Sequence, residues 1–128
     1  MTRDELIAYA LALTGERPGE DPDTECFAKP LTELLLKSLL GAENHLRAVK
    51  GLPELATVPD TDAGDIPFQR EITDGPLIYC TAAALAKMNG ETADAEEFRT
   101  EGVRLLRKVM PVLCAPTPSP YARGNARG

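Results

Sequence analysis

Four stretches of the chain repeat apolar residues every three or four positions, which is the spacing of one helix face. The first covers residues 3–14, where Thr2 and Glu5 form a T-x-x-E capping box and Gly15 is a typical helix stop. The second covers residues 30–50, with Pro30 in its first turn. Its apolar face is broad, so we expect it to be the central helix. We also expect Gly41 to mark a close contact with another helix.

The last two periodic stretches predict an αα-hairpin. Asp74 and Pro76 are typical of a helix start, and the third helix then runs through an alanine-rich segment to Asn89-Gly90. Thr92 is the predicted cap of the fourth helix, which runs to about residue 109. The short connector "NGET" makes the two helices antiparallel. We expect the hairpin to pack on the second helix, with Ala84, Leu85, Met88, Phe98, Leu105 and Val109 against Leu35, Leu39 and Leu46.

Residues 51–74 contain three prolines and no helical period. We expect a long loop there, with room for one short β-hairpin that pairs residues near 56–58 with residues near 66–72. A loop of this length in a compact domain is usually functional or disordered. Several apolar residues within it argue against plain disorder: Leu52, Leu55, Val58, Ile66, Phe68 and Ile72.

The chain changes character at residue 115. The segment 115–128, "APTPSPYARGNARG", has three prolines, two arginines and no acidic residue, so it cannot build a core. The pattern therefore predicts an all-α domain over residues 1–114, a small bundle of four main helices that ends in an αα-hairpin. An extended C-terminal arm over residues 115–128 follows it.

Composition and charge narrow the class of protein. With 128 residues, 43% of them hydrophobic, the chain can build one core, and it lacks an apolar run long enough to predict a membrane span. Cys26, Cys80 and Cys114 are far apart, which fits a reducing compartment.

Residues 1–74 carry 7 basic and 15 acidic side chains, whereas residues 75–128 carry 7 basic and 5 acidic. The acidic body argues against a general nucleic-acid binder. The asymmetry fits either solvated helix faces or one end of the molecule meeting the opposite end of another copy.

The sequence matches the residue patterns of catalytic and metal-binding sites only weakly. His45 is the only histidine and has no spaced partners, so we interpret it as a surface or packing residue. Asp60, Asp62 and Glu71 occupy positions one, three and twelve of an EF-hand-like loop, but its glycine falls at position five, so a solvated acidic turn is the better interpretation. We therefore predict no enzyme activity, no catalytic residue, no metal and no cofactor.

The helical hairpin carries a family resemblance. The segment "DGPLIYCTAAALAKMNGETADAEEFRTEGVRLL" resembles the head–tail connector, or adaptor, proteins of tailed bacteriophages, and the first helix resembles the usual adaptor opening. The resemblance lies in an Ala-rich helix, a short Gly-containing turn and an A-E-x-F helix start. These features fall on Ala84, Leu85, Ala86, Gly90, Ala95, Glu96 and Phe98. The chain departs from the adaptor pattern at Glu101 and Gly102, where many adaptors carry a tyrosine.

The resemblance implies a structural virion protein without an active site. Such a protein assembles in the bacterial host cytoplasm into a homo-oligomeric ring under the portal. The ring joins head to tail and prolongs the DNA channel, and DNA passes through it without specific binding. The predicted partners are the portal and the tail or head-closure proteins, with no membrane involved. The competing interpretations are a small cytoplasmic helical regulator, such as a toxin–antitoxin partner, and an enzyme accessory subunit.

The resemblance also indicates where partners are contacted. In the arm, we expect Tyr121 to serve as an aromatic anchor, with Arg123 and Arg127 pairing with acidic surface. In the loop, the expected contact residues are Asp60, Asp62, Asp65, Phe68 and Arg70. The helices would then be the scaffold, and the loop and arm the parts that reach neighbours.

Overall fold

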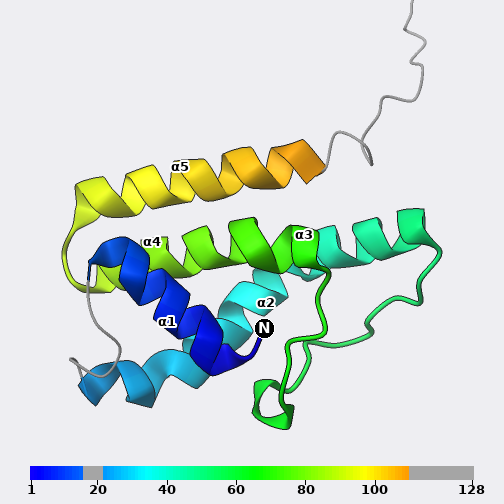
Figure 1. Ribbon diagram of the computed structural model, residues 1–128, viewed down its shortest axis with the longest axis horizontal. Coiled ribbons are helices and arrows are strands. Elements are labelled where there is room, and N and C mark those ends of the chain that lie inside the picture. The colour runs from blue at the N-terminus through cyan, green and yellow to red at the C-terminus, as the bar shows by residue number, and fades with distance from the viewer. Residues whose placement is uncertain (16–21, 110–128) are drawn as a thin grey trace, which may run out of the picture.

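The computed structural model describes residues 1–15 and 22–109, and this part of the chain is mostly helical (Figure 1). It contains four long helices and no strand: α1 (Arg3–Thr14), α2 (Pro22–Lys50), α4 (Ile78–Met88) and α5 (Thr92–Val109). Three short turns join α2 to α4, namely the 3-10 turn η1 (Thr61–Ala63), α3 (Arg70–Ile72) and the π-helical turn η2 (Thr73–Leu77). The predicted all-α class is confirmed, and none of the helices in the described ranges is long and apolar enough to cross a bilayer.

The first helix agrees with its sequence pattern. The Thr2 hydroxyl accepts a hydrogen bond from the Glu5 N–H at 3.2 Å, and the Glu5 carboxylate accepts one from the Thr2 N–H at 2.8 Å. Gly15 ends the helix with a φ of 87°, in the left-handed region that glycine adopts without a steric penalty. The capping box and the stop are therefore both confirmed.

The second helix is longer than predicted. It begins at Pro22, so Pro30 lies inside it and not in its first turn. An internal proline removes one backbone hydrogen-bond donor. The helix nevertheless stays continuous on both sides of Pro30. The expected close contact at Gly41 is wrong, because no heavy atom lies within 4 Å of the position that a Cβ would take there.

The third predicted helix begins before Asp74. Helical geometry starts at Arg70 and continues through α3 and η2 into α4, so Asp74 lies within the run and does not cap it. The π-helical turn falls where Pro76 interrupts the hydrogen-bond ladder, because proline has no N–H and needs space for its ring. The expected β-hairpin is also wrong in the described residues. Residues 70–72 are helical, and the loop forms only an isolated bridge between Thr2 and Asp65.

The αα-hairpin of α4 and α5 is confirmed. Asn89-Gly90 forms the turn, with Gly90 at a φ of 79°, although Thr92 is the first helical residue and not the cap. The tight contact between the two helices is at Gly102. A Cβ there would lie 3.2 Å from the Cys80 Sγ and 3.3 Å from the Tyr79 Cβ. Gly102 therefore has the role that the sequence pattern had suggested for Gly41.

The core consists of two clusters that meet along α1. The larger one contains Leu6, Leu36, Leu39, Leu46, Ile66, Phe68, Ile72 and Leu77, and the smaller one contains Ile7, Ala10, Leu11, Ala82 and Leu85. α4 packs mainly against α1 and α5, because its buried alanines let neighbouring helices approach closely. The expected packing of the hairpin on α2 is therefore only partly right. Met88 is 51% exposed, and Phe98 packs at the edge of the smaller cluster.

Candidate interaction surface

A groove of about 710 Å³ opens between α1 and the helical run from α3 to α4. One wall is formed by α1 and the other by α3, η2 and the start of α4. Its lining residues are Met1, Glu5, Tyr9, Ala12, Leu13, Phe68, Arg70, Thr73, Asp74, Ile78 and Tyr79. We refer to this site below as the α1 groove.

The α1 wall presents apolar side chains that the core does not use. Leu6, Ala10 and Leu11 are buried, which fixes the rotation of the helix. Tyr9 and Leu13 are one turn apart and lie off that buried face, at 52% and 37% exposure. Sequence reasoning missed this wall, because the apolar spacing over residues 3–14 was interpreted as one helix face. The available signal was that α1 carries more large apolar residues than one buried stripe needs.

The opposite wall is positioned by the hairpin. The ring of Tyr79 lies 6.4 Å from the ring of Phe98, centroid to centroid, and its Cβ is close to Gly102. Contact with α5 therefore holds Tyr79 at the edge of the groove. Further along this wall, the Arg70 Nε lies 3.1 Å from the Asp74 Oδ2 in an exposed ion pair.

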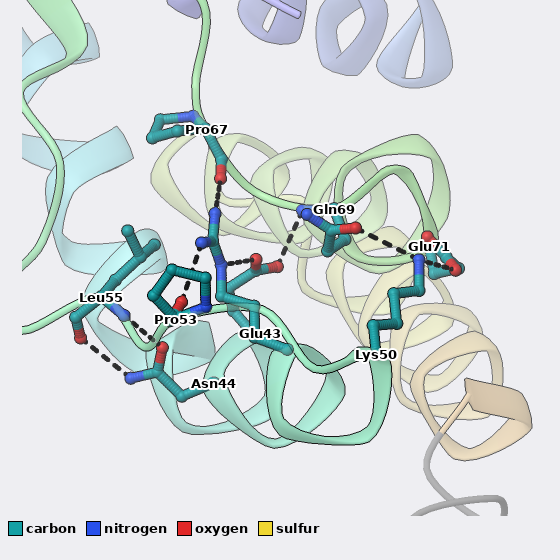
Figure 2. A network of polar contacts seen from close by, with 9 residues as sticks. Glu43, Asn44, Lys50, Pro53, Leu55, Pro67, Gln69 and Glu71 are labelled. Carbon is teal, nitrogen blue, oxygen red and sulfur yellow. Dashed lines mark hydrogen bonds and ion pairs between the residues drawn. The ribbon is translucent and has the colours of Figure 1, made fainter.

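The loop that follows α2 is held by polar side chains of that helix, as Figure 2 shows. Glu43 is fully buried, and its carboxylate accepts hydrogen bonds from the Arg47 Nε at 2.6 Å and from the Gln69 N–H at 2.8 Å. The Arg47 guanidinium also donates to the carbonyl oxygens of Pro53 and Pro67. A buried carboxylate needs such partners, so this pair ties both ends of the loop to α2.

Two further side chains of α2, Asn44 and Lys50, extend this network. The Asn44 side chain donates a hydrogen bond to the Leu55 carbonyl at 3.0 Å and accepts one from the Leu55 N–H at 2.8 Å. Lys50 donates to the Gln69 side chain at 3.1 Å and pairs with Glu71, and its hydrogen bond lowers the pKa of the Glu71 carboxyl. These bonds give the loop a defined path without a strand ladder, because side chains of α2 satisfy several of its backbone groups.

The predicted loop contact residues fall into different environments. Asp60 is exposed, and its side chain caps η1. Asp62 pairs with Lys29 and with Arg3, and these hydrogen bonds lower the pKa of its carboxyl. Asp65 lies 3.4 Å from the N-terminal amine of Met1.

The remaining predicted residues are split between core and surface. Phe68 is buried in the larger cluster and also lines the α1 groove. Arg70 is exposed on the groove wall. The structure thus brings Arg70 and Phe68 to one site, while the acidic residues lie beside η1. Tyr121, Arg123 and Arg127 lie outside the described residues.

Groups with potential chemistry are scattered. Within residues 1–15 and 22–109, no three His, Cys, Asp or Glu side chains cluster as metal ligands do. His45 is exposed on α2. Burial raises the pKa of the Cys80 thiol, which favours the protonated and less reactive form.

Family models, curated proteins and solved structures were all compared with this chain, and none of them matches it.

Proposed function

We infer that this protein is a ring-forming structural subunit of the connector between head and tail in a tailed bacteriophage. The observation that carries the proposal is the α4–α5 hairpin, in which an alanine-rich helix, a glycine turn and a second helix pack together. That hairpin coincides with the segment whose sequence resembles adaptor proteins. In this function the ring lies under the portal and surrounds the passing DNA, and no catalysis is required.

Two features of the surface support an assembling subunit. The α1 groove leaves Tyr9 and Leu13 accessible on a small helical domain, and exposed apolar groups next to a depression are typical of contact sites. The loop over residues 51–69 has a path defined by hydrogen bonds to side chains of α2, so it can present a fixed shape to a neighbour. A partner contact benefits from such rigidity, because less conformational entropy is lost on binding.

The charge distribution supports contacts between unlike ends. Arg107 and Lys108 are exposed at the end of α5, whereas the first 74 residues carry most of the acidic side chains. Unlike ends favour head-to-tail association, and head-to-tail association closes into a ring when the rotation between subunits allows it. An acidic channel wall would also repel phosphates and let DNA slide.

Native mass spectrometry and electron microscopy of the full chain, alone and mixed with a purified phage portal, test this function. We expect closed rings with a central channel that stack coaxially on the portal. A stable monomer that forms a one-to-one complex with a different protein would contradict the proposal and would favour the regulator interpretation.

A charge reversal sharpens this test. Replacing Arg107 and Lys108 by Glu should weaken assembly, and the loss should be larger at low salt because exposed charges are screened at high salt. The matched control is Arg99→Glu, which changes an exposed α5 residue paired within its own helix with Glu96. Equal effects of the two changes would contradict a contact at the end of α5.

A further inference from the structure

The α1 groove combines aromatic and acidic groups. Tyr9 and Tyr79 line it from opposite walls, and Leu13 adds an aliphatic surface. Proline-rich segments bind to aromatic-lined grooves, because their backbone is already extended and loses little entropy on binding. The groove thus has surface chemistry suited to such a segment.

Two carboxylates at the groove suit a basic ligand. Glu5 is exposed on α1, and Asp74 lies on the opposite wall in an ion pair with Arg70. Exposed ion pairs contribute little to stability, so an incoming guanidinium can replace Arg70 at Asp74 with little loss. A ligand that carries arginine next to proline and tyrosine would match both sets of groups.

The chain itself carries a segment of that chemistry. Residues 115–128 contain three prolines, Tyr121, Arg123 and Arg127, with no acidic residue, in a protein whose net charge is −6. The arm therefore offers proline and tyrosine for the aromatic walls of the groove, and arginine for its two carboxylates.

The arm is long enough to reach a groove on another copy. α5 ends at Val109 and packs along η2, where a Cβ on Gly75 would lie 3.0 Å from the Leu105 Cδ1. α1 crosses α4 on a different side from α5 (Figure 1), and η2, which contacts the end of α5, forms part of one wall of the groove. The chain from Val109 to Tyr121 can span roughly 40 Å when extended, which is enough to reach a neighbouring molecule.

We propose that the α1 groove receives the proline-rich arm, residues 115–128, of another copy of this chain. Tyr121 packs against Tyr9 and Leu13, and an arginine of the arm pairs with Asp74 or Glu5. Each molecule donates one arm and receives one, which is a head-to-tail contact. The exchange between copies rests on the proposed ring, whereas the fit of the arm to the groove does not.

Photo-crosslinking of the full chain tests the proposal. Tyr121 is replaced by benzoylphenylalanine, and isotope-labelled and unlabelled chains are mixed in equal amounts before irradiation. We expect crosslinks from position 121 to peptides that contain Tyr9, Leu13 or Tyr79, in pairs that join a labelled chain to an unlabelled one. Crosslinks that map to another surface, that join position 121 only to its own chain, or that fail to form would overturn the proposal.

A pair of double variants distinguishes docking in the groove from nonspecific association through exposed apolar side chains. Tyr9→Ala with Leu13→Ala should reduce crosslinking between copies by about tenfold, because both residues line the groove. Leu34→Ala with Met88→Ala removes exposed apolar side chains outside the groove and should leave the yield unchanged. All four side chains are exposed, so circular dichroism should show unaltered helix content in both variants. Equal loss in the two would contradict docking in the groove.

The outcomes for ring formation and for docking are independent. Rings whose arm crosslinks lie elsewhere would overturn the docking proposal and leave the connector function standing. Crosslinks in the groove of pairs or open chains that never close would support docking and contradict the ring.

Discussion

The α4–α5 hairpin and the loop over residues 51–69 are held in place by different kinds of contact. In the hairpin, buried alanines such as Ala82 and Ala86 and the close approach at Gly102 bring helices together over many small apolar contacts. The loop buries Ile66 and Phe68 in the core and is held in addition by individual hydrogen bonds from Glu43, Asn44 and Arg47. The hairpin is thus stabilised by burial spread over its length, whereas the loop combines two buried apolar side chains with a few specific hydrogen bonds.

This difference predicts how each region responds to change. Apolar contacts are individually weak, so losing one leaves the others in place. A buried polar group that loses its partner carries the full cost of its desolvation. Substitutions of similar size should therefore have local and severe effects in the loop network, and effects in the hairpin that depend on the space available.

The largest effect is expected for Glu43→Ala. The change leaves the Arg47 guanidinium and the Gln69 N–H without their buried partner, and breaking a buried ion pair costs about 3–5 kcal/mol of unfolding free energy. Urea denaturation measures the loss, and amide hydrogen exchange should show faster exchange at Gln69 than in the α4–α5 hairpin. The control Glu97→Ala removes an exposed helix carboxylate and should change stability by less than about 0.5 kcal/mol. Similar losses in both variants would contradict the role of Glu43.

The hairpin is tested by one substitution at two glycines. Gly102→Leu should destabilise the protein by about 1–3 kcal/mol, because the new side chain meets Cys80 and Tyr79. Gly41→Leu places the same side chain in α2, where its Cβ meets no heavy atom, and should stabilise by about 0.5–1 kcal/mol through helix propensity. Thermal unfolding of the two variants should therefore shift in opposite directions. Shifts of the same sign would show that the space around these glycines does not decide the outcome.

A smaller loss is expected for Asn44→Ala in the loop network. It leaves the N–H and carbonyl of Leu55 without their side-chain partner, which should cost about 1–2 kcal/mol because this site is only partly buried. Chemical denaturation gives the free energy, and exchange of the Leu55 amide gives the local effect. Ser38→Ala is the control, since Ser38 donates only within its own helix, to the Leu34 carbonyl. An unchanged exchange rate at the Leu55 amide would contradict its hydrogen bond to the Asn44 side chain.

The smallest effect is expected for Asp62→Asn, and it should depend on pH. Hydrogen bonds from Lys29 and Arg3 lower the pKa of the Asp62 carboxyl below its ordinary value of 3.8. The carboxylate therefore stabilises the fold above that value, and the contribution is lost as the pH falls through the lowered pKa. Denaturation midpoints should be lower for the variant at neutral pH and should converge with those of the wild type in acid. A difference that stays constant with pH would contradict this role.

The candidate groove shows why a sequence predicts helices more readily than it predicts surfaces. Tyr9 and Leu13 are ordinary members of an apolar helical pattern, and only the packing of α1 against α4 leaves them on the outside. Phe68 is the converse case, because the resemblance implied an accessible contact residue, whereas the loop folds back and buries most of its side chain. In both cases the missing information was which face of the segment meets the core.

The amino-acid sequence by itself determined the four long helices in outline, the capping box of Thr2 and Glu5, and the turn at Asn89-Gly90, because each depends on residues close together in the chain. The tertiary structure decided the path of the loop and the site of closest helix contact. Glu43 and Gln69 are 26 residues apart, and Gly102 meets Tyr79 across the hairpin. Such contacts leave no local period in the sequence, since they arise only when distant segments are buried together and must satisfy each other's polar groups and space.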